Sequence, residues 1–291
     1  MPDQTQNRKI ALITGATAGI GKATAEALAQ KSWHIILHGR SEQRCQALAV
    51  ELGQAYPQAK FDYLVADFSS LKSVRYLVQQ ATQNYPRLDV LINNAGSFFM
   101  NRQVSQDGFE LTLAVNHLAP FLLTMGLLDK LKASQNARIV NVSSGAHAGV
   151  ALNFEDLQLE RRYAGFQAYG GSKLMNIYFT YELHRRLQAE NLAGTQVCVN
   201  ALHPGFVSTE FAKNNGGIFR LAMSVMQKLH IGNPKSPAKG AETSVFLASS
   251  DTVTGVSGKY FDNCVEVLSS KVSYDQTAAA RLWEWSENAV K

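Results

Sequence analysis

A tyrosine and a lysine stand four residues apart in the segment Tyr169-Gly170-Gly171-Ser172-Lys173. On a helix that begins near this segment, such residues lie one turn apart on one face, so the phenol and the ammonium would be neighbours. A free tyrosine has a pKa of about 10, and a nearby positive charge stabilises the phenolate and lowers that pKa. The spacing therefore predicts a pair that moves a proton. The same spacing also occurs by chance on structural helices, so its meaning depends on its surroundings.

Two serines, Ser143 and Ser144, come directly after an apolar strand-like run. A hydroxyl at the end of a strand can hydrogen-bond a carbonyl oxygen as charge develops on it. Of the two we favour Ser144. Serines after a strand usually form turns, so this interpretation depends on Tyr169 and Lys173 being part of the same site.

Three glycines occur in Thr14–Gly21, directly after the first strand-like run. Glycines let the backbone turn sharply and approach a pyrophosphate at the start of the next helix. The spacing Gly-x3-Gly-x-Gly differs from the Gly-x-Gly-x-x-Gly fingerprint, and simple packing is an alternative. The position after the first strand favours nucleotide binding, because open sheets bind ligands at the carboxyl ends of their strands.

The second strand ends in His38-Gly39-Arg40-Ser41. A cofactor without a 2′-phosphate usually meets an Asp or Glu here, which accepts from the ribose hydroxyls. No acid stands at Gly39, and the Arg40 guanidinium can make paired hydrogen bonds with a phosphate, with Ser41 and Arg44 as helpers. NADP is therefore favoured over NAD, and a solvated loop cation is the alternative for Arg40.

The elements that position these residues alternate between strand and helix from the N-terminus onward. The expected strands are 10–14, 34–38, 61–66, 88–93, 138–143 and 195–202. The expected helices are 20–31, 41–55, 71–84, a long helix within 108–132, and 168–188. Such alternation predicts an α/β fold: a doubly wound parallel sheet of about seven strands with helices on both faces.

No repeat, low-complexity tract or linker interrupts this series, so residues 1–291 are expected to form a single domain. Within it, residues 208–237 are predicted to form an insertion over the substrate site. Its apolar residues recur at helical spacing between 216 and 230, which favours a lid over a lipophilic pocket. A plain surface helix and weak contact with a membrane surface are the alternatives.

Composition limits the classes of function. Hydrophobic residues make up 46% and charged residues 18% of the chain, which is typical of a globular protein. The net charge of +5 is spread along the chain without a basic block, so nucleic-acid binding is not expected. The three cysteines are far apart with no CxxC, which disfavours disulfides and metal sites and favours a reducing compartment. The polar start lacks a signal-peptide core, and no run reaches the roughly 20 apolar residues of a membrane span, so we expect a cytoplasmic protein.

Taken together, these motifs resemble the short-chain dehydrogenase/reductase family from about Lys9 to Asn263. The resemblance is carried by Thr14–Gly21, Asp67, Asn93-Asn94-Ala95-Gly96, Asn116, Ser144, Tyr169, Lys173 and Pro204-Gly205. Within the family the chain looks most like retinol dehydrogenase-type reductases. The features shared with them are Arg138–Ser144, the 25 residues from Ser144 to Tyr169, Val115–Leu118 and Gly258–Phe261.

The resemblance implies roles for individual residues. It assigns catalysis to Asn116, Ser144, Tyr169 and Lys173, with Asn116 holding a local bend and a water that links Lys173 to solvent. It assigns cofactor binding to Gly15, Thr17, Ala18, Gly19, Ile20, Gly21, Arg40, Ser41, Asp67, Phe68, Asn94, Ala95, Gly96, Tyr169, Lys173, Pro204, Gly205, Val207 and Thr209. Each of these residues could instead have a purely structural role: an Asx turn for Asp67, a buried helix amide for Asn116 and a strand end for Pro204.

The leading hypothesis is hydride transfer between NADP(H) and a carbonyl or alcohol, with Tyr169 donating or accepting the proton. Phe98, Phe99, Met100, Phe206 and Phe211 favour a lipophilic aldehyde or ketone. Retinal is a candidate by resemblance, although the chain lacks the apolar N-terminal anchor of the membrane-bound members. The alternatives are a light-dependent protochlorophyllide reductase, whose enzymes carry a cysteine where this chain has Phe206, and a non-catalytic protein that senses NADP. The resemblance also implies a homodimer or homotetramer through the long helices that contain Asn116 and Tyr169.

Overall fold

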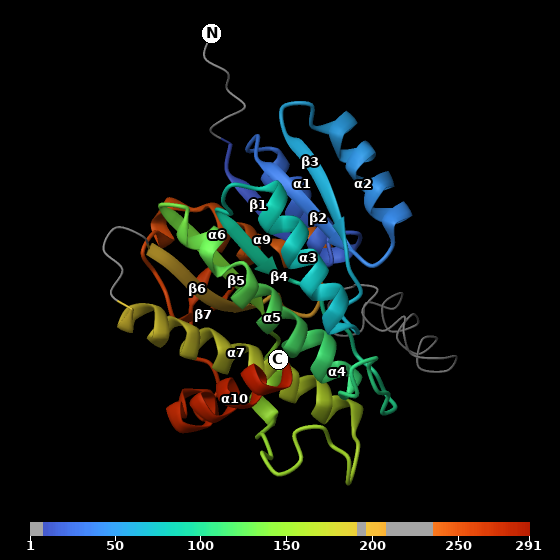
Figure 1. The fold of residues 1–291 in the computed structure, drawn as a ribbon. Coiled ribbons are helices and arrows are strands. Elements are labelled where there is room, and N and C mark those ends of the chain that lie inside the picture. The colour runs from blue at the N-terminus through green and yellow to red at the C-terminus, as the bar shows by residue number, and fades with distance from the viewer. Residues whose placement is uncertain (1–7, 191–195, 208–234) are drawn as a thin grey trace.

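One sheet of eight strands forms the centre of the structure (Figure 1). The computed structural model describes residues 8–190, 196–207 and 235–291. The strands are β1 (Ile10–Ile13), β2 (His34–Gly39), β3 (Lys60–Val65), β4 (Val90–Asn93), β5 (Asn136–Val142), β6 (Gln196–His203), β7 (Lys259–Asp262) and β8 (Val265–Glu266). Their order is β3-β2-β1-β4-β5-β6-β7-β8, and only the pairing of β7 with β8 is antiparallel in the described residues. The order reverses between β1 and β4, which is where sheets of this type bind ligands.

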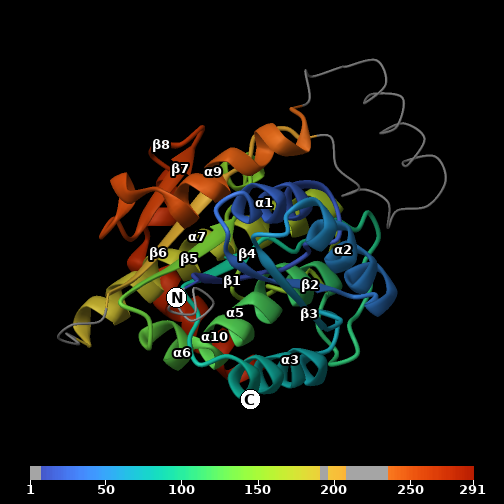
Figure 2. The same cartoon turned by 90° about the horizontal axis from the view of Figure 1, so that it is seen from above.

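Helices cover both faces of the sheet (Figure 2). The longer helices are α1 (Gly19–Ala29), α2 (Glu42–Ala55), α3 (Leu71–Asn84), α5 (Ala119–Gly126), α7 (Gly165–Ala189), α9 (Pro237–Ser249) and α10 (Gln276–Ala289). Side chains alternate along β1: Ala11 and Ile13 join the core under α1, α2 and α9, whereas Ile10 and Leu12 join the core under α3, α5 and α7. The period of two along a buried strand thus builds two separate cores from one sheet.

The predicted fold class is confirmed, with one strand more than expected. The six predicted strands correspond to β1–β6, and the sequence patterns assign neither β7 nor β8. The long helix expected within 108–132 is broken into α4 (Leu111–Leu113), a π-helical turn (Ala114–Leu118), α5 and α6 (Leu128–Lys132). The predicted lid, 208–237, lies outside the described residues except for its last three.

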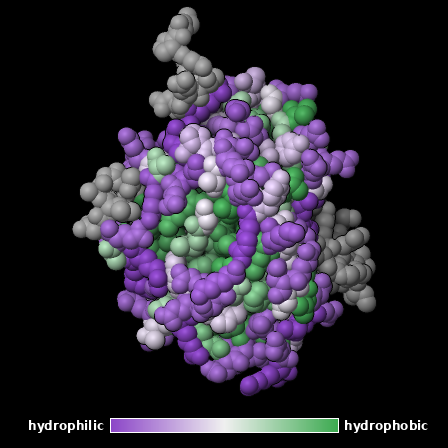
Figure 3. Space-filling view, viewed as in Figure 1, coloured by the Kyte–Doolittle hydropathy of each residue, from purple (hydrophilic) through white to green (hydrophobic). Residues whose placement is uncertain are grey.

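Helix α10 packs against α7 and completes the core on that side. Trp283 is 3% exposed and stacks on Phe179, with ring centroids 5.8 Å apart, and meets Phe121 edge-on at 5.1 Å. Part of the surface that the sequence assigns to a second subunit is therefore occupied by the chain's own C-terminal helix. Figure 3, viewed as in Figure 1, shows apolar side chains gathered in a hollow of a face that is otherwise hydrophilic. The dimer or tetramer stays a prediction.

In the described residues, none of the helices combines the length and the apolar character that crossing a membrane requires.

Candidate active site

The glycine turn between β1 and α1 is built so tightly that side chains do not fit. Gly15 and Gly19 have φ values of +65° and +54°, the left-handed region that favours glycine. A Cβ on Gly21 would lie 2.3 Å from the carbonyl oxygen of Gly15. Ala18, at the N-cap of α1, provides no side-chain cap, so the first N–H groups of the helix are left for another acceptor.

Asn94 and Thr14 fix this turn to the neighbouring strand. The Asn94 side-chain amide donates to the Thr14 carbonyl oxygen at 2.8 Å. The backbone N–H groups of Asn94 and Ala95 both donate to the Thr14 hydroxyl at 2.9 Å. These bonds join the carboxyl ends of β1 and β4 where the strand order reverses.

A side chain at Gly39, at the end of β2, would press against side chains of the glycine turn and of α2. A Cβ on Gly39 would lie 2.7 Å from Thr17 Cγ2 and 2.8 Å from Cys45 Sγ. Packing against the glycine turn and α2 therefore explains why the position is a glycine.

Two arginines and a serine lie just beyond Gly39 in the chain. Arg40 is exposed. The Ser41 hydroxyl caps α2 by accepting from the Arg44 N–H at 3.3 Å, and the Arg44 guanidinium donates to the Thr17 carbonyl oxygen at 3.3 Å. The positive charge thus lies beside the glycine turn, as a phosphate on the adenosine ribose would require.

His38, Asp67 and Phe68 lie below this charged edge. The Phe68 ring is buried and stacks on His38 at 4.5 Å, so its side chain belongs to the core. Burial lowers the pKa of His38 to about 4, and its ring contacts the Gly15 N–H at 3.4 Å and the Ala66 carbonyl oxygen at 3.2 Å. Asp67 Oδ1 accepts from the Ser69 N–H at 2.9 Å, which is an Asx turn, the alternative that the sequence leaves open.

Tyr169, Ser144 and Lys173 come together above β5. The Ser144 side chain lies close enough to the Tyr169 hydroxyl to lower its pKa. Lys173 Nζ lies 5.6 Å from the centroid of the Tyr169 ring and donates to the Val142 carbonyl oxygen at 3.0 Å. Because α7 begins at Gly165, Tyr169 lies in its second turn and Lys173 in its third rather than at its start.

Burial dominates the acidity of this pair. It raises the pKa of Tyr169 to about 12, against a smaller opposing effect of the hydrogen bond with Ser144. It lowers the pKa of Lys173 to about 8. The expectation that Lys173 lowers the pKa of Tyr169 below its usual value does not hold in this structure, because desolvation of the phenolate is the largest cause of the shift and raises that pKa.

Asn116 lies in the π-helical turn, fully buried. Its side-chain amide donates to the Ser97 carbonyl oxygen at 2.9 Å and to the Ser172 hydroxyl at 3.0 Å, and its oxygen accepts from the Ser97 N–H at 2.8 Å. A Cβ on Gly96 would lie 3.2 Å from Lys173 Nζ and 3.4 Å from Asn116 Oδ1. The side chains of Asn116 and Lys173 therefore meet at Gly96, and π-helical turns of this kind are frequent at functional sites.

The segment after β6 approaches the start of α1. Gly205 has a φ of +82°. A Cβ on Gly240 would lie 2.6 Å from Val207 and 3.3 Å from Ile20, so these two side chains flank the same small space. Val207 thus lies near Ile20 at the start of α1, and a Cβ on Gly205 would meet the Lys235 side chain. Thr209 and Phe211 lie outside the described residues.

Aromatic rings line the approach to Tyr169. The buried Phe98 ring meets Tyr169 edge-on at 5.9 Å and Phe166 at 5.0 Å. Phe166 is 68% exposed and is not among the residues that the sequence singles out, although it precedes Tyr169 by three residues on the same helix. Met100 and Phe206 are also exposed.

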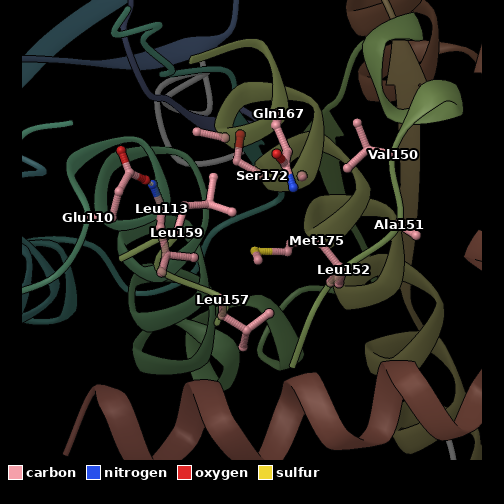
Figure 4. A pocket seen from close by; sticks show the side chains of 12 residues that line it. Glu110, Leu113, Val150, Ala151, Leu152, Leu157, Leu159, Gln167, Ser172 and Met175 are labelled. Atoms are coloured by element: carbon pink, nitrogen blue, oxygen red, sulfur yellow. Dashed lines mark hydrogen bonds between the residues drawn. The ribbon is translucent and has the colours of Figure 1, made fainter. Parts of the chain in front are cut away.

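A small pocket lies beside α7, and Gln167, Ser172 and Met175 of that helix line it (Figure 4). Its lining includes Ala168, Gly171 and Met175, which share one side of the helix, and Leu152 and Leu157 from the preceding loop. Its lining also includes the polar residues Glu110, Gln167 and Ser172, but none of the glycine turn, so we do not assign cofactor binding to it.

No metal-binding group of three His, Cys, Asp or Glu residues occurs in residues 8–190, 196–207 and 235–291. The cysteines Cys45, Cys198 and Cys264 are free thiols.

Comparisons with known proteins agree with this arrangement. Residues 9–217 match the model of the short chain dehydrogenase family. The chain is 43% identical to retinol dehydrogenase 14 from Mus musculus over 97% of this chain and 86% of that protein. A crystal structure of an uncharacterised protein from Mycobacterium paratuberculosis is similar with a TM-score of 0.76 and 31% identity, covering 98% of this chain and 93% of the other. A structure described as an NAD(P)-dependent gluconate 5-dehydrogenase from Beutenbergia cavernae with bound NADP has a TM-score of 0.68 and 26% identity, covering 88% and 94%.

Proposed function

Because the chain belongs to the short-chain dehydrogenase family and is therefore an oxidoreductase of CH–OH or C=O groups, we propose that it interconverts lipophilic carbonyls and alcohols with NADP(H). One observation carries this proposal. The phenol of Tyr169, the hydroxyl of Ser144 and the ammonium of Lys173 lie together at the carboxyl end of β5, in the same sheet edge as the glycine turn.

The residues around the glycine turn fit a dinucleotide. The uncapped start of α1 suits a pyrophosphate, and Arg40 with Arg44 suits a 2′-phosphate. The residues that we propose as cofactor contacts are Gly15, Thr17, Ala18, Gly19, Ile20, Gly21, Arg40, Ser41, Asp67, Phe68, Asn94, Ala95, Gly96, Tyr169, Lys173, Pro204, Gly205 and Val207, together with Thr209. When bound, NADPH supplies the hydride that reduces the carbonyl carbon.

The chain's own residues handle the proton. Tyr169 donates its hydroxyl proton to the carbonyl oxygen, which becomes the hydroxyl of the product alcohol. Ser144, whose side chain lies near the Tyr169 hydroxyl, orients the carbonyl oxygen and stabilises the charge that develops on it. Lys173 is held by Val142 and positions its remaining N–H groups near Gly96 and Asn116.

The protonation state of Tyr169 suits reduction at neutral pH. Because burial raises its pKa to about 12, the phenol is protonated and ready to act as an acid. Alcohol oxidation needs the phenolate, so we expect that direction to gain rate as the pH rises.

The aromatic approach supports a lipophilic substrate. Phe98 and Phe166, with Met100 beside the start of the same helix, would offer apolar contacts near Tyr169 and little to a sugar hydroxyl. The name of the 43% identical relative makes retinal a reasonable first member of a test panel.

The test monitors the absorbance of NADPH and, separately, NADH with retinal, long-chain and aromatic aldehydes and ketones, and small sugars. We expect turnover of the lipophilic carbonyls with NADPH. A preference for small sugars would contradict the substrate class, and cofactor binding without turnover across the panel would contradict the enzymatic function.

A further inference from the structure

Two histidines from different elements hold a single peptide group beside the proposed proton donor. His147 Nδ1 lies 2.6 Å from the carbonyl oxygen of Ser144. His203 Nδ1 accepts from the N–H of Gly145 at 3.0 Å. That carbonyl and that N–H belong to one peptide, the Ser144–Gly145 peptide, which directly adjoins the Cα that carries the Ser144 hydroxyl. His147 lies in the 3₁₀ helix Gly145–Gly149, and His203 ends β6.

The second nitrogen of His147 fixes its tautomer. Nε2 accepts from the backbone N–H of Ser270 at 3.0 Å, so it carries no proton, and the neutral ring must bear its proton on Nδ1. His147 therefore donates to the Ser144 carbonyl oxygen. His203 has the opposite tautomer, because its Nδ1 must be free of a proton to accept from Gly145.

The bond from Gly145 to His203 Nδ1 and the bond from Ser270 to His147 Nε2 both require a neutral ring, because a protonated nitrogen cannot accept. Burial lowers the pKa of His147 and the pKa of His203. Around His203, Asp262 favours the charged form, whereas Lys235 and His147 oppose it. The ring of Tyr260 packs on His147 at 5.2 Å.

Asp262 offers a protonated His203 an alternative partner. It lies on β7 directly beside His203 in the strand register. Its Oδ1 is buried without a hydrogen-bond partner among the described residues. A proton on Nδ1 of His203 would face the Gly145 N–H donor to donor, and the contact would be lost.

We propose that His147 and His203 are positioning residues, which as neutral rings hold the Ser144–Gly145 peptide so that the Ser144 hydroxyl stays beside Tyr169. Acid releases this pair of contacts, the clamp, at His203, where a proton on Nδ1 removes the acceptor for Gly145. A proton on Nε2 of His147 leaves the donation to Ser144 and breaks the bond with Ser270 that holds the ring in place. The proposal rests on the proposed carbonyl reduction, in which Ser144 orients the carbonyl oxygen. The proposal predicts that kcat falls at acid pH, which gives its pH profile an acid limb. The KM for NADPH should stay unchanged, because other contacts hold the glycine turn.

The first test determines which nitrogen of each histidine ring carries the proton, and it needs no enzymatic turnover. Long-range proton–nitrogen NMR spectra of the whole chain, labelled with ¹⁵N in histidine, distinguish the two neutral tautomers. At about pH 7.5 we expect the proton on Nδ1 of His147 and on Nε2 of His203. Either ring in the other tautomer, or charged at that pH, would overturn the proposal.

The second test uses asparagine variants, because an asparagine side chain can replace Nδ1 of histidine and does not titrate. His203→Asn keeps an acceptor for Gly145, and His147→Asn keeps a donor for Ser144. The control is His184→Asn, because His184 Nδ1 bonds the Ser257 hydroxyl at 2.9 Å and its pKa is also lowered by burial, but it does not contact the clamp.

We expect kcat of the parent and of His184→Asn to fall by about tenfold per pH unit below the limiting histidine pKa. The double variant His147→Asn/His203→Asn should keep kcat within about threefold from pH 5 to pH 8, with folding checked by thermal unfolding. A parent without an acid limb, or a limb unchanged in the folded double variant, would overturn the proposal. If no protein turns over any carbonyl, the proposed function fails instead, while the NMR test of the clamp still stands.

Discussion

Adding one methyl group to Gly21 tests the glycine turn more sharply than removing a charge would. A Cβ there would lie 2.3 Å from the Gly15 carbonyl oxygen and 2.7 Å from Asn94 Nδ2, so the turn itself must move. Gly53, in α2, is the matched control, because a Cβ there would meet nothing within 4 Å. Both positions are helical, so alanine gains the same intrinsic helix propensity in each.

The magnitude is set by two opposing effects. Replacing a helical glycine by alanine stabilises by about 1 kcal/mol when the space is open, which is the expectation for Gly53→Ala. In Gly21→Ala, overpacking against backbone costs about 3 kcal/mol and leaves a net loss of about 2 kcal/mol. The difference of about 3 kcal/mol corresponds to roughly 6 °C in Tm for a chain of this size.

The assay is thermal unfolding of both variants together with a fluorescence titration of NADPH. We expect Gly21→Ala to melt roughly 6 °C below Gly53→Ala and to bind NADPH at least about tenfold more weakly, because Gly15 and Asn94 shift. Equal Tm values with equal affinities would show that the turn yields freely and would refute the steric reasoning.

Three further predictions concern the core, the pH dependence of stability and the cofactor. Trp283→Ala should reduce the free energy of unfolding by about 3–5 kcal/mol, because the ring is 3% exposed and stacks on Phe179; a urea titration showing a loss below about 1 kcal/mol would count against it. His38 and His117 have their pKa values lowered by burial from 6.5 to about 4, so stability is complete above pH 6.5 and falls as the unfolded chain takes up protons. At pH 4 each should cost about 3 kcal/mol, and equal urea midpoints at pH 7 and pH 4 would contradict this. Arg40→Asp should lower the NADPH-to-NADH ratio of kcat/KM by about ten- to a hundredfold, whereas an unchanged ratio would place the phosphate elsewhere.

Local sequence patterns predict the sheet well up to β6 and miss the elements nearer the C-terminus. The apolar residues of β1–β6 form strand-length runs between helical segments, and these runs indicate the fold class but not the order of the strands. The two-residue strand β8 is too short to leave a period of two. Helix α10 does leave a pattern, since Ala279, Leu282, Trp283 and Ser286 are buried at helical spacing after the N-cap Asp275. That helix could have been predicted.

The candidate site, like the fold, could be predicted from the sequence only in part. The spacing of Tyr169 and Lys173 on one helix predicts their proximity, which the structure shows. The pKa of Tyr169 could not be predicted, because it depends on burial by segments distant in the sequence. The contacts of His147 and His203 with one peptide likewise join three separate segments, and no local pattern encodes them.

The most direct test of the account is a single-turnover measurement with Tyr169→Phe, which removes the hydroxyl and keeps the ring. Enzyme saturated with NADPH is mixed with a lipophilic aldehyde, and the loss of NADPH absorbance is recorded beside a titration of NADPH affinity. We expect affinity within about twofold of the parent and a rate of hydride transfer lower by about 10²–10⁴-fold. A folded variant that reduces the aldehyde at the parent rate would contradict the assignment of Tyr169 as the proton donor.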